Sequence, residues 1–236
     1  MAFKDKTRYP GRNELAGLPF HDRSEAGRSL GMELAKRIIP DHPIVLALPR
    51  GGVPVGSQVA KQLKCPLDIV VARKLSVPWQ PELAIGAIAG QARVFDRDAI
   101  RAFRISSERL ERVLAQEIRE MGRREDLYRG EGAPPPDVLD CTAILVDDGL
   151  ATGWTMLAAA RYVRTLHPRR IIAAVPVGSA SGCKRLAQEL DDCICLTRPE
   201  PFFAVQQWYT DYRQVTDEEV RQILTDIRQI RPIIGC

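Results

Sequence analysis

The run from residue 143 to residue 155, AILVDDGLATGWT, constrains the fold of this chain more than any other segment. Its four apolar residues predict a short buried strand, and an apolar helix follows from Met156. A strand that feeds a helix through a Gly/Thr loop is typical of α/β proteins, where loop amides and the helix N-terminus bind a phosphate. A turn that merely ends a buried strand would explain Asp-Asp-Gly, but it would not require the two threonines.

Apolar strands and helices alternate through most of the remaining chain. Strands are expected at 44–48, 68–72, 171–177 and 193–197, and helices at 22–38, 53–63, 156–166, 180–190 and 216–230. This order predicts an α/β fold with a parallel sheet and helices on both faces. Ligands of such sheets bind at the carboxyl ends of the strands, where the candidate residues lie.

The middle of the chain interrupts this alternation. Residues 75–82, LSVPWQPE, contain two prolines and predict an exposed, mobile loop, while 83–89 and 93–96 predict short strands paired across Gly90–Gln91. A long amphipathic helix is expected at 106–127, as a lid, a dimer contact or a scaffold, and a homodimer would cover its apolar stripe. The expected organisation is an N-terminal arm (1–21) and a single domain (22–236), with an insertion at 97–136 and a hood-like segment at 199–215.

Composition narrows the class of ligand. The chain has 34 basic and 30 acidic residues, a net charge of +4, and no long Lys/Arg run, so we expect an anionic small molecule rather than nucleic acid. Neither a signal core nor a membrane-length apolar stretch occurs, so a cytoplasmic location is expected, with no membrane partner. The sequence contains no Cys-x-x-Cys pair, serine-hydrolase elbow or P-loop.

The run VDDGLATGWT resembles the 5-phosphoribosyl-1-diphosphate (PRPP) binding motif of the type I phosphoribosyltransferases. The wider layout (LPRGGVP, then RKL, then this run, then PEPFF) is similar to predicted bacterial members of that family over about residues 22–225. The resemblance implies a Rossmann-like core with a variable hood. It also implies an enzyme that binds Mg-PRPP and joins the 5-phosphoribosyl group to a nitrogenous base with release of diphosphate, with Mg²⁺ as cofactor.

The resemblance assigns roles to three segments. Asp147 and Asp148 would bind the ribose hydroxyls and Mg²⁺, directly or through water, and both are expected to face solvent at the strand end. Arg50, Gly51 and Gly52 would form the diphosphate loop, although Arg-Gly-Gly alone also suits a plain turn. The 5-phosphate would be held by Gly149, Leu150, Ala151, Thr152, Gly153, Trp154 and Thr155.

Further candidates come from less specific segments. Arg73 and Lys74 precede the Pro-rich loop and would act in catalysis, although basic residues are common at strand ends. Ala151 stands where 6-oxopurine enzymes carry a third acid, so Glu82 becomes the candidate general acid, or else a plain exposed carboxylate. Phe202 and Phe203 would stack on the base or anchor the C-terminal helix. The Trp154 indole must point outwards or against the hood.

A second class of function remains open from the sequence. The same fold could serve a regulatory protein that senses PRPP or a nucleotide without turnover. A hydrolase or phosphorylase acting on a phosphorylated sugar is a third alternative. The sequence names a donor, PRPP, and leaves the acceptor base open.

Overall fold

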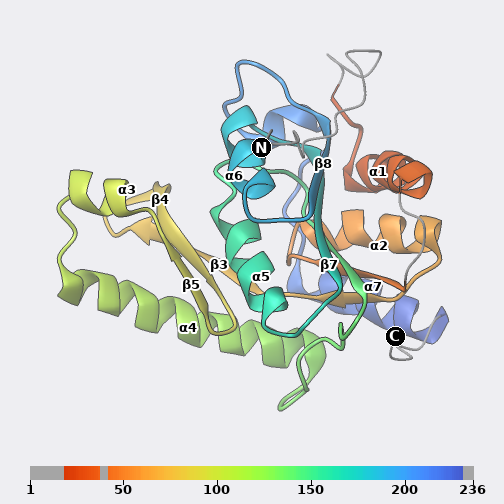
Figure 1. The fold of residues 1–236 in the computed structure, drawn as a ribbon, viewed down its shortest axis with the longest axis horizontal. Helices are drawn as coiled ribbons and strands as arrows, with labels where there is room; N and C mark the ends of the chain where they lie inside the picture. The colour runs from red at the N-terminus through yellow and green to blue at the C-terminus, as the bar shows by residue number, and fades with distance from the viewer. Residues whose placement is uncertain (1–18, 38–41, 231–236) are drawn as a thin grey trace, which may run out of the picture.

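A five-stranded parallel sheet forms the centre of the molecule. The computed structural model describes residues 19–37 and 42–230. The sheet order is β2-β1-β6-β7-β8, built from β1 (Pro43–Ala47), β2 (Leu67–Ile69), β6 (Thr142–Val146), β7 (Arg170–Val177) and β8 (Asp192–Thr197) (Figure 1). Every neighbouring pair in it is parallel. The predicted α/β class is therefore confirmed.

Helices cover both faces of this sheet (Figure 1). One face packs against α1 (Arg23–Arg37), α2 (Gly52–Leu63) and α7 (Asp217–Ile230), and the other against α5 (Trp154–Arg164) and α6 (Ala180–Ala187). Alternate strand residues feed the two cores: Ile144 and Val146 belong to one, Ala143 and Leu145 to the other. Burial on both faces explains why the strands read as continuous apolar runs.

A second, antiparallel sheet replaces the loop that was expected at 75–82. It contains β3 (Ala72–Val77), β4 (Gln80–Ala89) and β5 (Ala92–Phe95) in the order β3-β4-β5. The loop prediction was wrong because Pro78 lies in the tight turn and Pro81 in a stretch where the β3–β4 register shifts. Neither proline therefore has to donate a ladder hydrogen bond. The predicted pairing across Gly90–Gln91 is confirmed.

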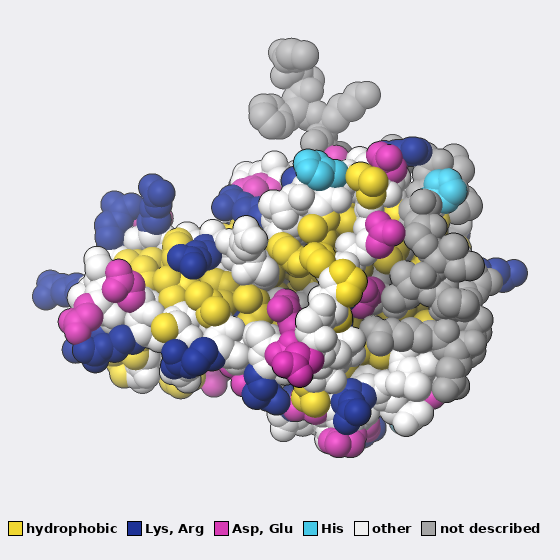
Figure 2. Space-filling model, turned by 90° about the horizontal axis from the view of Figure 1, so that it is seen from below, with side chains coloured by type: hydrophobic (Ala, Val, Ile, Leu, Met, Phe, Trp, Pro, Cys, Tyr) yellow, Lys and Arg dark blue, Asp and Glu magenta, His cyan; other side chains and the backbone are white. Residues whose placement is uncertain are grey.

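The inserted helices pack on this second sheet. α3 (Arg97–Ala102) precedes α4 (Ser107–Arg129), whose buried residues Leu114, Met121 and Tyr128 join the same core as β3, β4 and α7. Most of the apolar stripe is thus covered within one chain, while Ile118 on the same helix is 39% exposed. Figure 2 shows hydrophobic side chains across the middle of this lobe and charged side chains around its rim.

The chain segments before α1 and after β8 lie together. Of the predicted N-terminal arm, residues 19–21 are described and the rest lies outside the described residues. Phe20 is buried, and its backbone N–H donates to the carbonyl of Trp208, the last residue of the short helix η1 (Val205–Trp208). Its carbonyl accepts from the N–H of Thr210. Among the described helices, none has the length and apolar character needed to cross a membrane.

Candidate active site

The two acids lie at the carboxyl end of the central strand β6. Leu48, which follows β1, donates its backbone N–H to the carbonyl of Val146 at 2.8 Å, so the ends of β1 and β6 meet at one edge. β2, the next strand in the chain, pairs with one side of β1, and β6 pairs with the other side. The direction in which strands are added therefore reverses between β1 and β6, which makes this edge a switch point of the sheet. Open α/β sheets bind their ligands in the crevice at such points.

The loop after β1 touches the acids directly. A Cβ atom at Gly51 would lie 2.1 Å from Oδ2 of Asp148, and one at Gly52 would lie 2.6 Å from the carbonyl oxygen of Val146. Close approach therefore requires glycine at both positions. The Pro49–Arg50 peptide bond is cis. The structure thus brings the predicted diphosphate loop and the acid pair together.

Asp148 is buried and ion-paired, which corrects the expectation that both acids face solvent. The residue is 8% exposed, and its Oδ2 lies 2.8 Å from Nε of Arg23 on α1. Burial alone would lower the pKa of the Arg23 guanidinium, but the charge and hydrogen bond of Asp148 raise it overall. This acid is part of the scaffold because a buried arginine neutralises it.

Residues of the hood complete the surroundings of this ion pair. The Arg23 guanidinium lies 3.9 Å from the centre of the Tyr212 ring, and its Nη1 donates to the carbonyl of Arg213 at 2.8 Å. The Tyr209 hydroxyl donates to the backbone carbonyl of Asp148 at 2.5 Å. Helix α1, the acid motif and the hood therefore form one buried network.

Asp147 is the more exposed acid of the pair. It has intermediate exposure, and its Oδ1 accepts the backbone N–H of Asp148 at 2.8 Å. Burial, and then the charge of Asp148, raise the pKa of Asp147 well above its ordinary value. A carboxylate that is costly to ionise alone is suited to a ligand that brings hydrogen-bond donors or a cation.

The loop from residue 149 to residue 155, here called the phosphate loop, is tied to the end of β7. The backbone N–H of Leu150 donates to Val177, and its carbonyl accepts from Ser179. The Leu150 N–H is thus bonded within the protein and its side chain is buried, although Leu150 was among the residues expected to hold the 5-phosphate.

The exit of the phosphate loop retains the features of an anion site. Gly153 has φ +80° and precedes α5, whose first turn has no side-chain cap. Ala151 and Thr152 are exposed just before it. Free amides at a helix N-terminus are suited to a phosphate.

The predicted cationic residues are held by carboxylates on neighbouring helices. Nη1 of Arg50 lies 3.6 Å from Oδ1 of Asp217, and Nε of Arg73 donates to Oε2 of Glu117 at 2.7 Å. Lys74 is exposed on β3. Glu82 is also exposed, on β4, and no hydrogen bond or ion pair within the described residues joins it to the acids.

The two candidate base-binding rings differ in exposure. Phe203 is 75% exposed, whereas Phe202 packs against the cluster that contains Phe20 and Tyr209. The hood also approaches the phosphate loop, since a Cβ at Gly149 would lie 2.4 Å from the Val205 side chain. The hood therefore lies directly over the motif.

Comparison with known proteins places this arrangement in a family. The family model described as "Phosphoribosyl transferase domain" matches residues 23–213. The chain belongs to the phosphoribosyltransferase family. Arg23 and Arg213, which bond to each other in the buried network, are the two ends of the matched segment.

Individual relatives agree with this assignment. Two proteins from strains of Mycobacterium tuberculosis, "Putative phosphoribosyl transferase MT0597" and "Putative phosphoribosyl transferase Rv0571c", are each 41% identical over 202 residues, or 85% of this chain. The matched part is 45% of their own length. The crystal structure of TT1426 from Thermus thermophilus superposes with a TM-score of 0.73 at 38% identity, over 89% of this chain and 99% of that one.

Two arginines beside the motif were not predicted from the sequence. The residues around Arg23 in the sequence do not indicate its role, since its partner Asp148 lies 125 residues away. Arg185 on α6 donates to the carbonyl of Thr152 and lies 3.9 Å from the centre of the Trp154 ring. Trp154 therefore rests on α6, not on the hood or in solvent. Arg185 adds positive charge beside the phosphate loop. The basic residues around it in the sequence did not indicate this position.

Proposed function

We propose that this phosphoribosyltransferase binds Mg-PRPP, transfers the 5-phosphoribosyl group to a nitrogenous base and releases diphosphate. The observation that carries the proposal is the meeting, at one sheet edge, of Asp147, the Gly51–Gly52 turn and the uncapped start of α5. These three features supply a hydroxyl acceptor, a close backbone approach and an anion site.

The donor would lie along this edge with each charged group near a complementary one. The 5-phosphate would accept from amides at the start of α5 and from the hydroxyls of Thr152 and Thr155, with Arg185 beside them. The ribose hydroxyls would donate to Asp147. Diphosphate would lie against Gly51 and Gly52, with Arg50 turned from Asp217 toward it. Asp148 would position Asp147 and the turn without touching the ligand.

Magnesium fits this arrangement as an ion carried mainly by the ligand. Among the described residues, no group of three or more His, Cys, Asp or Glu side chains could hold a metal. Mg²⁺ needs one or two carboxylates when phosphate oxygens and water complete its shell. Asp147 would provide that carboxylate, and the ion would offset charge on diphosphate.

The reaction would break the bond between ribose C1 and diphosphate oxygen and form a bond between C1 and a base nitrogen. Diphosphate leaves with the electron pair, so cationic groups near it stabilise the developing charge. Arg50, Arg73 and Lys74 would contribute if the β3–β4 hairpin closes over the site. Glu82, on the same hairpin, is our candidate for proton exchange with the base, since Ala151 offers none. Phe202 and Phe203 are the candidates for stacking on that base.

A regulatory protein that senses PRPP is the second candidate, and the Arg23–Asp148 pair favours it. One acid of the motif is neutralised by the chain itself, which leaves a single carboxylate for the ligand. Binding could survive this arrangement while turnover is slow.

Diphosphate release from Mg-PRPP with a panel of purines, pyrimidines and related heterocycles tests the proposal. Base-dependent release that falls in Asp147→Asn would support the enzyme. PRPP binding by calorimetry without release on any base would favour the sensor. An absence of binding to PRPP and to ribose 5-phosphate would reject both.

A further inference from the structure

A separate cavity lies between the inserted helix and the core. Its volume is about 170 Å³, room for about six water molecules at bulk density. Four segments line it: the β2–β3 junction, the last turns of α4, the Pro-rich linker at 130–136, and α5. None of its lining residues belongs to the proposed PRPP site.

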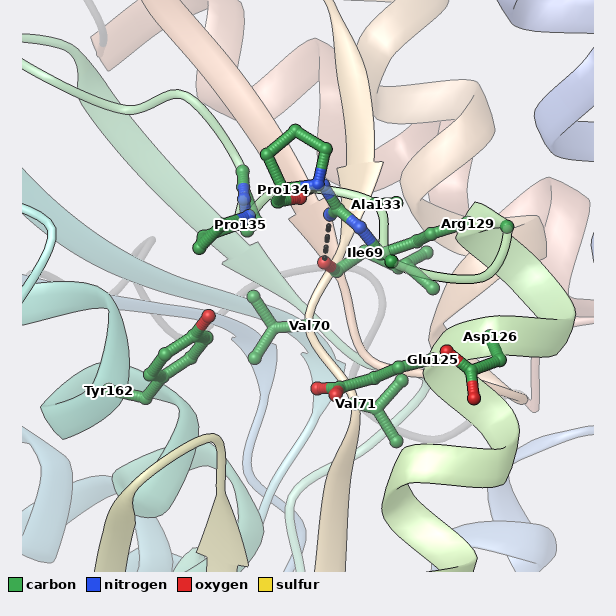
Figure 3. Close-up of a pocket in the computed structure, with 13 residues that line it drawn as sticks. Ile69, Val70, Val71, Glu125, Asp126, Arg129, Ala133, Pro134, Pro135 and Tyr162 are labelled. Carbon is green, nitrogen blue, oxygen red and sulfur yellow. Dashed lines mark hydrogen bonds between the residues drawn. The ribbon is translucent and has the colours of Figure 1, made fainter.

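One part of the cavity wall is apolar, and the rest is polar. Val70 and Val71 form its floor, and Pro134 and Pro135 face them from the linker (Figure 3). Tyr162 closes the side toward α5. This ring is fixed in place because the β4–β5 turn packs on it: a Cβ at Gly90 would lie 2.3 Å from the ring.

Two polar groups face the cavity without a hydrogen-bonding partner among the described residues. Figure 3 shows the Glu125 carboxylate and the Tyr162 hydroxyl extending toward the same space from α4 and α5. Within the described residues neither group makes a hydrogen bond or an ion pair. Both side chains are half-buried, so they have lost part of their contact with water without gaining a donor in exchange, and a ligand that supplies one would be favoured.

The charge balance of the cavity is negative. Arg129 is already engaged, because it donates to Oδ2 of Asp68 at 2.7 Å and to the carbonyls of Ile69 and Pro134. Among the described residues, neither Glu125 nor the exposed Asp126 makes an ion pair with a basic side chain. An anionic ligand would therefore meet repulsion here, and a cation would not.

The ionisation behaviour of the two polar groups agrees with this charge balance. Burial raises the pKa of Glu125, and the nearby Arg129 lowers it in part. Burial, and then the charge of Glu125, raise the pKa of Tyr162. Burial is the larger cause of both changes, and the charge of Arg129 offsets them only in part.

We propose that this cavity binds a small organic cation, a primary ammonium group on a short apolar body. The ammonium would donate to the Glu125 carboxylate and the Tyr162 hydroxyl. The body would lie against the valine and proline walls. The proposal goes beyond the PRPP site and does not depend on it, since no residue is shared.

The test uses benzylammonium as the probe and benzyl alcohol as its neutral counterpart. NMR titration of the labelled protein should show amide shifts at the linker and the β2–β3 junction. We expect benzylammonium to bind about tenfold more tightly than benzyl alcohol, as a charge-assisted hydrogen bond would provide.

Variants assign this preference to the cavity. Glu125→Gln should weaken benzylammonium binding about tenfold, and Tyr162→Phe by a smaller factor. Asp126→Asn, which removes an exposed charge one residue away, should change it less than about twofold. Far-UV circular dichroism and the unperturbed spectrum elsewhere would show that each variant is folded.

Three outcomes would overturn the proposal. The first is equal binding of the two probes to the unmodified protein. The second is no amide shift around the cavity at millimolar benzylammonium. The third is equal weakening by Glu125→Gln and Asp126→Asn, since this would indicate general attraction to an acidic surface. None of these measurements involves PRPP, so their failure leaves the proposed activity untouched.

Discussion

Nε of Arg23 lies 2.8 Å from Oδ2 of Asp148, and this ion pair joins the first described helix to the centre of the sheet. The two side chains are 10% and 11% exposed. One acid of the motif is therefore paired inside the protein, while Asp147 is the more exposed of the two. The two carboxylates are adjacent in sequence and differ in their surroundings.

Arg23→Met should destabilise the protein by about 3–5 kcal/mol, because it leaves the Asp148 carboxylate buried without a partner. Urea unfolding would measure the change. Arg101→Met is the control, because Arg101 pairs with Asp98 on an exposed surface and should cost less than about 1 kcal/mol. Equal losses in the two variants would mean that the buried pair does not stabilise the fold.

Asp147→Asn and Asp148→Asn should have separable effects. Asp147 has a raised pKa, so its ionised form is disfavoured in the fold, and a neutral Asn should leave the free energy of unfolding unchanged or higher. PRPP affinity should nevertheless fall by about tenfold or more. Asp148→Asn should mainly reduce stability, because it leaves Arg23 buried and unpaired. Calorimetry with PRPP and urea unfolding would separate the two, and a reversed pattern would contradict the assignment.

Gly51→Ala should disturb the acid pair although the backbone accepts alanine. Gly51 has φ −60°, so the new methyl group acts through its collision with Asp148 Oδ2. We expect a loss of about 1–3 kcal/mol in unfolding free energy, together with weaker PRPP binding. Gly122→Ala is the matched control, because a Cβ there meets nothing within 4 Å and should stabilise α4 by about 0.4–1 kcal/mol. A Gly51 variant that behaves like the Gly122 variant would show that the turn can move away.

Arg185→Gln should weaken ribose 5-phosphate binding by about threefold to tenfold, because it removes a cation beside the phosphate loop. The loss should shrink at high salt, as expected for a partly exposed charge. Calorimetry at two salt concentrations would measure both effects. Lys184→Gln, an exposed neighbour on α6, should change little, and a similar loss there would point to nonspecific attraction.

Benzylammonium binding to the cavity at Glu125 should depend on pH. The ionised carboxylate is required, and its pKa is raised by burial, so affinity should be present above that pKa and be lost as pH falls through it. Asp126 and Arg129 on α4 and Tyr162 on α5 also face the cavity, and the Asp126→Asn variant removes the second carboxylate of its lining. The Asp126→Asn variant should still lose affinity for benzylammonium as the pH falls. This loss should begin at a higher pH than the pH at which an exposed glutamate becomes protonated. An affinity that is constant down to the pH of an exposed glutamate would contradict the role of Glu125.

Local sequence patterns were sufficient to predict the elements that carry the site. The strand ending at Val146, the loop after it and helix α5 follow from apolar runs and small residues that are contiguous in the chain. The inserted helix α4 was equally visible because its stripe repeats at helical spacing. Such features depend on neighbours within a few residues, which one sequence reveals.

Contacts between distant segments could not be read in the same way. Arg23 meets Asp148, and Arg185 meets Trp154, through tertiary packing that no spacing rule encodes. The hairpin of β3 and β4 was hidden because prolines usually break strands, and here they fall at its turn and its register shift. The hydrogen bond from the Leu150 N–H to the end of β7 could be predicted only from the strand order, which places β7 next to β6.

The buried network also determines when the site can be completed during synthesis. Arg23 emerges from the ribosome early, Asp148 appears 125 residues later, and the carbonyl of Arg213 follows 190 residues after Arg23. Until the last of these segments is available, the nascent sheet carries a carboxylate and a guanidinium that lack part of their final surroundings. Contacts of such separation form late and slow the folding of a domain. Ligand binding should therefore be among the last properties that a growing chain acquires, well after its central strands can pair.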